Sequence, residues 1–252
     1  MITSFDICIA SFNIRNGIAW DGADSWLLRR GATTQSIARL DTDVAGLQEV
    51  YGFQQRYLLR HLAGYAAAGR GRGGGLITGR LLGGEGCPVV YRSARLRLER
   101  QLTRWFSDTP DEVGSRSWGD PLPRIVTFAW FTEIATGRRF GFASLHLDEA
   151  SRESRARSVT ALLEWLEPGL PWIIVGDFNA VAGEIPIQRM LDEGFRDVLT
   201  EQAGGAAPAG PRLDYIFVSG EWEIQSGQIA PPAPSRRRPS DHLPLVADLH
   251  LA

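Results

Sequence analysis

Short apolar runs alternate along the chain with amphipathic segments, a pattern that predicts strands and helices in turn. The clearest run, Ile173-Ile174-Val175, follows Pro171-Trp172 and is typical of a strand buried on both faces. The same criterion predicts further strands at 5–12, 44–50, 87–92, 125–134, 140–147, 214–218 and 222–229, and a last strand that ends at 249. Helical periodicity predicts helices at 26–40, 53–62, 151–166 and 187–191. The first helix is expected to turn Leu27, Ile37 and Leu40 inward, and the third packs outside the sheet.

Two long segments between these elements are expected to be loops at the rim of the fold. Residues 66–86 are rich in glycine and arginine, and backbone nests of this composition can cradle phosphate. No Lys-Ser or Lys-Thr pair follows, so the segment is not a nucleotide P-loop, and a rim loop is the expectation. Residues 103–123 are irregular and aromatic, and long loops inside compact domains are often functional. A third loop of small residues is predicted at 204–211.

Length, composition and charge limit the classes of protein to which the chain can belong. The chain of 252 residues is expected to form one domain, 1–252, because no linker or internal repeat divides it. Lysine is absent, and a formal net charge of −2 argues against a surface coated with basic residues for long nucleic acid, although it leaves a local basic groove open. Cys8 and Cys87 lack metal or disulfide spacing, so buried free thiols in a reducing compartment are expected. With no signal segment and no membrane-spanning run, we expect a soluble, cytoplasmic protein without an obligate protein partner.

Polar residues recur where predicted strands begin or end. Asp177 and Asn179 follow the buried run at 173–175, and alternation along an extended chain places them on the same side. Such a pair suits a hard metal ion, a reacting water or an oxyanion, although Gly-Asp and Asn also form ordinary Asx turns. The full set of strand-end residues is Asn13, Glu49, His146, Asp177, Asn179, Asp214, Asp241 and His242.

This set contains the parts that hydrolysis of a phosphate ester needs. Three members offer the hard oxygen ligands that Mg²⁺ prefers: Asn13, Glu49 and Asp241. Asp214 can hold His242 in one tautomer, and the Asp177–Asn179 pair suits a water or an oxyanion. Phosphoester hydrolysis requires a metal to offset charge, a base for water and donors for the equatorial oxygens.

The order of these residues resembles the endonuclease/exonuclease/phosphatase superfamily, which has the deoxyribonuclease I-like fold. The matching motifs are Ser-Phe-Asn-Ile-Arg at 11–15, Leu-Gln-Glu-Val at 47–50, Ser-Leu-His-Leu-Asp at 144–148, Gly-Asp-Phe-Asn at 176–179, Leu-Asp-Tyr-Ile-Phe at 213–217 and Ser-Asp-His-Leu-Pro at 240–244. They follow the family's order and cover essentially the whole chain. The resemblance implies an α/β (α+β) fold, a four-layer α/β/β/α sandwich with two mixed β-sheets packed face to face and helices outside, and an active site at one edge of the sheets.

The resemblance also assigns roles to the strand-end residues. It implies that Asn13, Glu49 and Asp241 bind Mg²⁺, with Mn²⁺ as the alternative, and leaves one or two ions open. It implies that His242, oriented by Asp214, is the base or polarises the phosphate, that Asp177 and Asn179 position or activate water, and that His146 contacts the phosphate. Whether Asp177 or His242 takes the proton stays open.

One position departs from the pattern of apurinic-site endonucleases, which have an acid where this chain has Arg15. The Asn-Ile-Arg form, with Gly84-Glu85 and the segment from Trp118 to Arg124, resembles a bacterial branch that includes sugar-phosphate phosphatases. Arg15, Trp118 and Arg124 are then candidates for the substrate side. For Arg124 and Trp118, a salt bridge and a core aromatic are the structural alternatives.

Three functions remain open on these grounds. The leading hypothesis is an Mg²⁺-dependent phosphatase that acts on a small phosphorylated metabolite, such as a sugar phosphate or a nucleotide. The second is an endonuclease or exonuclease, with Arg236–Arg238, Arg70 and Arg72 lining a groove for DNA or RNA, and a steep salt dependence would favour it. The third is a non-hydrolytic enzyme or a binding protein that reuses the fold.

Overall fold

The computed structural model describes residues 4–73, 83–202 and 211–252, and two six-stranded sheets form its centre. The strands of the first sheet are, in order, β11 (Trp222–Ile229), β12 (Leu245–Leu251), β1 (Phe5–Asn13), β2 (Val44–Gln48), β4 (Val89–Arg92) and β3 (Tyr65–Ala68). Those of the second are β5 (Leu96–Trp105), β6 (Ile125–Glu133), β7 (Arg139–His146), β8 (Trp172–Asp177), β10 (Asp214–Val218) and β9 (Arg196–Asp197). Both sheets are mixed, because β1 runs parallel to β2 and β7 to β8, whereas neighbours such as β1 and β12 are antiparallel.

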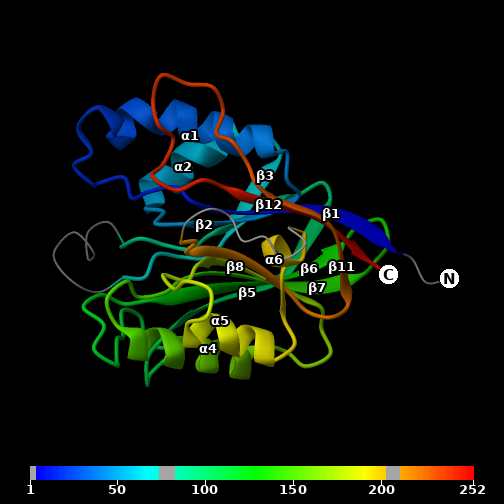
Figure 1. The fold of residues 1–252 in the computed structure, drawn as a ribbon. Helices are drawn as coiled ribbons and strands as arrows, with labels where there is room; N and C mark the ends of the chain where they lie inside the picture. The colour runs from blue at the N-terminus through cyan, green and yellow to red at the C-terminus, as the bar shows by residue number, and fades with distance from the viewer. Residues whose placement is uncertain (1–3, 74–82, 203–210) are drawn as a thin grey trace.

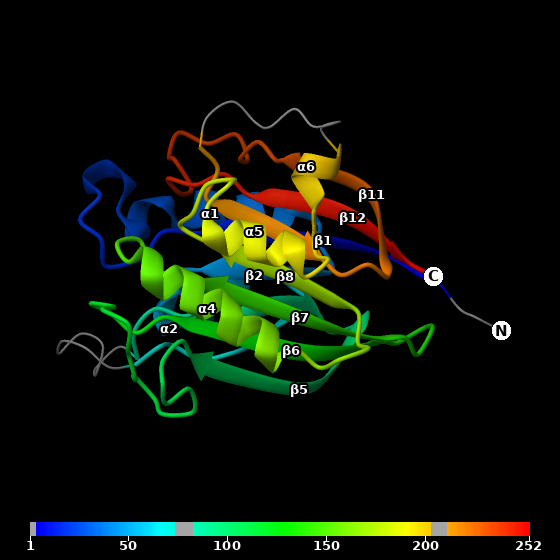
Figure 2. The ribbon, with the colours of Figure 1, turned by 60° about the horizontal axis from the view of Figure 1, so that its bottom comes forward.

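Helices cover the outer face of each sheet (Figure 1). α1 (Trp26–Leu40) and α2 (Gly52–His61) lie over the first sheet, and α4 (Arg152–Trp165) and α5 (Ile185–Asp192) lie next to each other over the second, as Figure 2 shows. Two shorter helices, η1 (Gly22–Asp24) and α6 (Val198–Gln202), complete the set in the described residues. None of the helices among them is both long and apolar enough to cross a lipid bilayer. The predicted four-layer α/β/β/α sandwich is confirmed.

The strand β8 shows why the run at its centre, Ile173-Ile174-Val175, is apolar at every position. Ile173 and Val175 pack between the two sheets, whereas Ile174 belongs to the cluster under α4 and α5. Successive side chains of a strand point to opposite faces, so the middle of a strand with protein on both sides favours apolar side chains, whereas the polar Asp177 lies at the end of the strand. A third apolar cluster, which includes Phe12 and Ile37, packs α1 and α2 against the first sheet.

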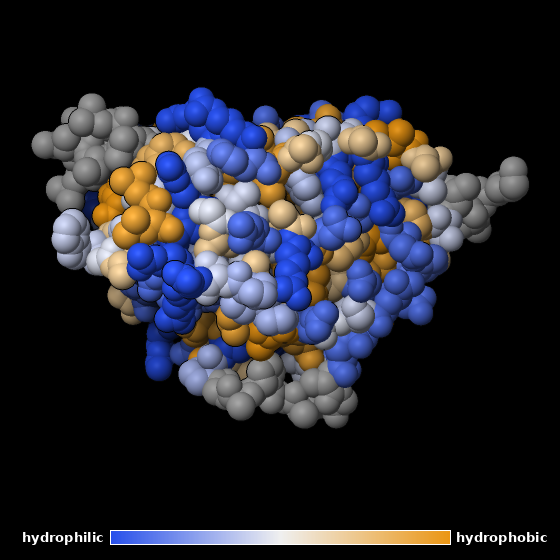
Figure 3. Space-filling view, turned by 90° about the horizontal axis from the view of Figure 1, so that it is seen from above, coloured by the Kyte–Doolittle hydropathy of each residue, from blue (hydrophilic) through white to orange (hydrophobic). Residues whose placement is uncertain are grey.

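The inward face of α1 differs from the prediction. Leu27 was expected to face the core, but it is 71% exposed, and the buried positions include Trp26, Arg29, Thr33 and Ile37. Arg29 and Thr33 donate hydrogen bonds to the main-chain oxygen of Pro239. Polar side chains therefore occupy buried positions of the helix, and a search for apolar periodicity does not identify them. Figure 3 shows the face over α1 and α2, where hydrophilic side chains predominate and apolar ones form small separate areas.

Five elements of the described residues were not predicted from the sequence, and the short elements η1 and β9 are two of them. The strand β5 carries exposed charged residues such as Arg97 and Arg100 and so lacks a clean alternation, and the predicted loop at 103–123 therefore began too early. The strand β3 overlaps the start of the predicted loop at 66–86, and α6 was not predicted. The loops predicted at 66–86 and 204–211 fall in part on residues 74–82 and 203–210, which lie outside the described residues.

Candidate active site

Strand ends from both sheets meet at one edge of the sandwich. In the second sheet, Asp177 pairs in register with Asp214 on one side and with His146 on the other. In the first sheet, Asn13 ends β1, and its Nδ2 donates to Asp177 Oδ2 at 3.1 Å across the sandwich. The predicted residues of the two sheets are therefore in direct contact.

The two central strands, β1 and β8, end in the same kind of turn. Asn13 Oδ1 accepts a hydrogen bond from the Arg15 amide at 3.0 Å, and Asp177 Oδ1 accepts one from the Asn179 amide at 2.9 Å. Arg15 and Asn179 adopt left-handed φ values of 60° and 47°, and Glu49, just after β2, has a φ of 63°. This conformation costs a non-glycine residue about 1–3 kcal/mol and is often found at functional sites. The Asx-turn and functional interpretations of Asp177 and Asn179 are thus compatible, because the turn itself fixes the two side chains.

The carboxylate of Asp214 orients His242 at this edge of the sandwich. Asp214 Oδ2 lies 2.7 Å from His242 Nδ1, and the opposite ring nitrogen, Nε2, lies 3.8 Å from Asp177 Oδ2. Burial lowers the pKa of His242, but the hydrogen bond and the charge of Asp214 outweigh it and raise this pKa to about 9. Burial and the neighbouring charge of Asp214 raise the pKa of Asp177 to about 7. An imidazolium beside a carboxyl that titrates near neutrality can give or take a proton.

His146 stands on the other side of Asp177, with its Nε2 3.7 Å from Asp177 Oδ2. Burial, together with the positive charges of Arg124 and Arg72, lowers the pKa of His146 well below its usual value. The ring is therefore neutral at neutral pH and can donate one hydrogen bond. A neutral donor of this kind suits the predicted contact with a phosphate oxygen.

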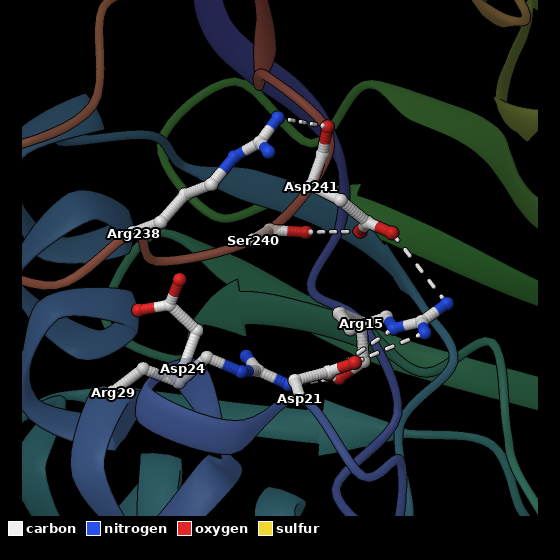
Figure 4. A pocket seen from close by; sticks show the side chains of 7 residues that line it. All are labelled: Arg15, Asp21, Asp24, Arg29, Arg238, Ser240 and Asp241. Carbon is white, nitrogen blue, oxygen red and sulfur yellow. Dashed lines mark hydrogen bonds and ion pairs between the residues drawn. The ribbon is translucent and has the colours of Figure 1, made fainter.

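The three predicted metal ligands are linked by hydrogen bonds. Asn13 Nδ2 donates to Glu49 Oε1 at 2.9 Å, and Ser240 Oγ donates to the Asn13 carbonyl at 2.6 Å and lies 3.2 Å from Asp241 Oδ1. Figure 4 shows Asp241 between Arg238 and Arg15, at the edge of a cavity that also contains acidic groups. The three ligands offer oxygen donors and include two carboxylates, which is the chemistry that Mg²⁺ selects. The residues present therefore fit a divalent cation of this type.

A second group of ligand atoms lies close to the first. Asp177, Asp214 and His242 each bring one potential ligand atom within 4.8 Å of the others. Asp214 Oδ2 is engaged with His242, whereas Asp214 Oδ1 is buried and has no hydrogen-bond partner among the described residues. A buried carboxylate oxygen without a partner is a place where a bound ion or a water completes the bonding.

Two arginines border a narrow cavity beside His146. The lining residues are Glu49, Arg72, Glu85, Gly86, Cys87, Pro123, Arg124, Ile125 and His146. Arg124 is 4% exposed, and its Nε donates to the buried Asp148 at 3.1 Å. Arg72 Nη2 lies 3.0 Å from Glu85 Oε2. The salt bridge that was the structural alternative for Arg124 exists, and the guanidinium also borders the site.

Comparison with known proteins agrees with this geometry. The sequence model of the endonuclease/exonuclease/phosphatase family matches residues 10–242, a range that includes all eight strand-end residues. The chain belongs to this family. Its place in the family confirms the resemblance that the six motifs carried.

Solved structures of the family superpose over nearly the whole chain. A family protein from Bacteroides thetaiotaomicron is 26% identical, with a TM-score of 0.88 over 100% of this chain and 97% of that one. A mannosyl-6-phosphatase from the same bacterium is 28% identical, with a TM-score of 0.83 over 96% and 99%. Among curated sequences, YbhP of Escherichia coli is 29% identical over 136 residues, 51% of this chain and 53% of YbhP. The matches to curated relatives span between 36% and 53% of those proteins' length.

In this member of the family, two of the predicted substrate-side residues lie outside the cavity beside His146. Trp118 Nε1 donates to Asp108 Oδ1 at 2.9 Å, and the Arg157 guanidinium of α4 lies 5.7 Å from the Trp118 ring centroid. Arg15 lies in the cavity beside Asp241, with its Nη1 3.5 Å from Asp241 Oδ2. Contact of Trp118 and Arg15 with a substrate stays a prediction.

Sequence reasoning missed two residues that the structure places in the site of this family member. Ser240 joins Asn13 to Asp241, and its signal was the Ser-Asp-His motif that precedes His242. Glu85 binds Arg72, and its signal was the Gly-Glu pair before the strand β4. Neither motif shows which side chain Ser240 or Glu85 contacts in the folded chain.

Proposed function

We propose that the protein is a metal-dependent phosphoesterase that hydrolyses a phosphate ester by attack of water. The proposed cation is Mg²⁺, with Mn²⁺ as the alternative. The observation that carries the proposal is the pair of Asp214 and His242, 2.7 Å apart, facing Asp177 at the edge where Asn13 meets Glu49. This edge combines a proton-transfer group, oxygen ligands for a cation and donors for an anion, and phosphoester hydrolysis requires all three.

Each group has a role in the proposed reaction. A divalent cation held by the three oxygen ligands would supply positive charge against the phosphate oxygens. Asp177 and Asn179 would position the attacking water, and His146 would donate to a phosphate oxygen. His242, held by Asp214, would donate a hydrogen bond while it is charged and accept a proton once it is neutral. Whether Asp177 or His242 takes the proton of the water stays open.

The proposed substrate is a small phosphorylated metabolite, such as a sugar phosphate or a nucleotide. The similar mannosyl-6-phosphatase, 28% identical over nearly its whole length, supports a sugar phosphate. The formal charge of −2 and the narrowness of the cavity beside His146 also favour a small substrate over a long polyanion. We place the reaction in the cytoplasm, because the free thiols of Cys8 and Cys87 suit a reducing compartment.

The proposal is tested by assaying hydrolysis with Mg²⁺ and again with a chelator. The substrates are a panel of sugar phosphates and nucleotides, together with labelled DNA and RNA, and His242→Ala is the control variant. We expect phosphate release from small monoesters that disappears with chelator and falls at least about 100-fold in His242→Ala, as expected for loss of a general acid–base group. Absence of hydrolysis on the whole panel would contradict the proposal.

A nuclease is the second candidate, and one observation favours it. Arg236, Arg237 and Arg238 are exposed in the segment before Asp241, and Arg238 Nη2 donates to the Asp241 carbonyl at 2.9 Å. Arginines in such a position could bind a nucleic-acid backbone. Binding through several phosphates falls steeply as salt rises, whereas hydrolysis of a small monoester changes little. We expect the activity to depend only weakly on salt concentration. Cleavage of polynucleotide without hydrolysis of monoesters would instead identify the protein as a nuclease.

A further inference from the structure

Arg72 and Arg124 reach the same cavity from two different loops. Arg72 follows the bridge at Gly71, and Arg124 immediately precedes β6. Both arginines line this cavity together with His146. Arg124 is fixed through Nε by Asp148, and its two Nη atoms make no hydrogen bond to another described residue. Two cationic groups therefore converge beside a neutral donor at the reacting edge.

Three contacts fix Arg72 in this position. Its main-chain amide donates to the Glu85 carbonyl at 2.8 Å, its carbonyl accepts from Trp105 Nε1 at 2.6 Å, and its Nη2 lies 3.0 Å from Glu85 Oε2. The side chain is only 11% exposed. A buried arginine held at its backbone and at one nitrogen has little freedom left to lose when its other nitrogens bind a ligand.

The neighbouring Arg70 has a different position. Its guanidinium lies 5.5 Å from the Trp105 ring centroid, beside an outer cavity that Gln101 and Thr103 help to line. The two arginines come from one glycine-rich stretch, yet Arg72 borders the site and Arg70 does not. Arg70 therefore serves as a matched control for substitutions of Arg72.

The cavity beside His146 is too narrow for a bulky group. Its lining includes the uncharged residues Cys87, Pro123 and Ile125, and it has room for little more than a water molecule. A terminal phosphate oxygen is about that size, whereas the second ester substituent of a phosphodiester is much larger. A phosphate monoester carries close to two negative charges at neutral pH, and a diester carries one. The cavity thus matches a terminal oxygen of a monoester in size. Its lining contains Arg72 and Arg124 together with the acids Glu49 and Glu85, so it offers a phosphate two guanidinium groups rather than a net positive charge.

We propose that Arg72 is a specificity residue that, together with Arg124, binds terminal oxygens of a phosphate monoester and disfavours phosphodiesters. This inference rests on the proposed phosphoesterase function. Arg72 and Arg124 bind the oxygens on the cavity side, and arginine suits this task because its planar fork matches phosphate geometry.

The test compares p-nitrophenyl phosphate with bis(p-nitrophenyl) phosphate for the full chain with Mg²⁺. In Arg72→Gln we expect kcat/KM for the monoester to fall about 10- to 100-fold, the range for loss of one charge-assisted hydrogen bond, with a change of less than about threefold for the diester. Arg70→Gln should match the wild type on both substrates. An unchanged ratio of monoester to diester hydrolysis in Arg72→Gln would overturn the inference.

A double variant separates recognition from a merely structural ion pair. Arg72→Gln combined with Glu85→Gln removes both buried charges, so melting temperature should recover toward the wild type. If Arg72 acts only by pairing with Glu85, monoester activity recovers as well, and the inference is wrong. We expect the monoester preference to stay lost.

Binding of inorganic phosphate, measured by calorimetry with Mg²⁺, distinguishes failure of this inference from failure of the proposed function. We expect binding that weakens about tenfold or more in Arg72→Gln and not in Arg70→Gln. If the wild type binds phosphate through Arg72 but hydrolyses no ester, the proposed function fails and the anion site stands. If it hydrolyses monoesters and Arg72→Gln binds phosphate normally, the anion site fails and the function stands.

Discussion

Asp177 is the residue at which the two halves of the site meet. Its Oδ2 accepts from Asn13 of the opposite sheet at 3.1 Å and lies 3.7 and 3.8 Å from the Nε2 atoms of His146 and His242. Its Oδ1 accepts from the Asn179 amide, so the carboxylate cannot rotate freely. This residue, with 2% exposure, is thus fixed by its own turn and surrounded by three polar groups from β1, from β7 and from the loop before β12.

The contact between Asp214 and His242 yields the first prediction at the residue scale. Asp214→Asn keeps the size of the side chain but removes the charge that holds the protonated ring. An amide nitrogen in place of Oδ2 would also demand the other tautomer of His242. We expect kcat to fall by about 10²–10⁴-fold, the range for a general acid–base group, at a temperature where circular dichroism shows the variant to be folded. Asp248→Asn, a substitution on exposed β12 residue Asp248, is the control, and activity retained in Asp214→Asn would contradict the assigned role.

Asp120 gives a prediction for stability against pH. Asp120 is 6% exposed, and neither carboxyl oxygen has a hydrogen bond of normal geometry to another described residue, although the Ser154 hydroxyl is near. Burial raises the pKa of Asp120 from 3.8 to about 6, so the folded state keeps this proton while the unfolded state loses it. The free energy of unfolding therefore falls as pH rises from about 4 to 6, by up to about 3 kcal/mol, and stays low above that. Denaturant titrations should show this loss in the wild type and not in Asp120→Asn. Equal pH profiles would contradict the prediction.

At the scale of elements, the sequence predicts where a segment lies better than which way it faces. The bounds of α1 were predicted correctly, because hydrophobic positions and their breaks mark the ends of a helix. Its inward face was partly wrong, because Arg29 packs inside through bonds to carbonyls at 14–16 and 239, contacts that no local pattern encodes. The strand β5 was missed for a similar reason, since an edge strand with charged residues is stabilised by its partner β6 rather than by its own alternation.

Gly31 allows a prediction for the element α1. It lies within this helix on the exposed side, and a methyl group added there would meet no atom within 4 Å. Glycine in a helix interior is less favourable than alanine by about 0.5–1 kcal/mol. Gly31→Ala should therefore raise the melting temperature by roughly 1–4 °C in a domain of this size and leave kcat and KM unchanged. A lower melting temperature would mean that this turn of α1 requires glycine.

At the scale of the whole molecule, the motifs predicted which residues lie together at the edge of the sheets. They did not predict which residues line each of the surrounding cavities. The strand-end residues were predictable, because strand ends of packed sheets share an edge and the motifs mark those ends. The separation of Arg72 from Arg70 was not, because it depends on Glu85 and Trp105, which are distant in the sequence. Trp118 was assigned to the substrate side on the motif alone, and its contacts with Asp108 and Arg157 also depend on the folded chain.

The candidate site joins residues of both sheets, and Gly46 is where the effect of the spacing between the sheets can be tested. A methyl group at Gly46 of β2 would lie 2.3 Å from Val175 Cγ2 and 2.7 Å from Ser144 Oγ, both in the second sheet. Nearby, Gln48 Nε2 donates to Ser144 Oγ at 3.3 Å, and Asn13 donates to Asp177. Gly46→Ala should push the sheets apart and destabilise the protein by about 1–3 kcal/mol, as overpacked cores do.

Because Asn13 and Asp177 belong to opposite sheets, Gly46→Ala should also lower kcat at temperatures where the variant is fully folded. A displacement of about 1 Å between reacting groups can reduce a rate by about 100-fold. Circular dichroism fixes the folded temperature range, and kinetics within that range measure the effect on catalysis, with Gly31→Ala as the matched glycine-to-alanine control. Normal kcat in folded Gly46→Ala would mean that the strand ends hold their geometry independently of the spacing between the sheets. Reduced kcat would mean that the packing of the two sheets is itself part of the active site.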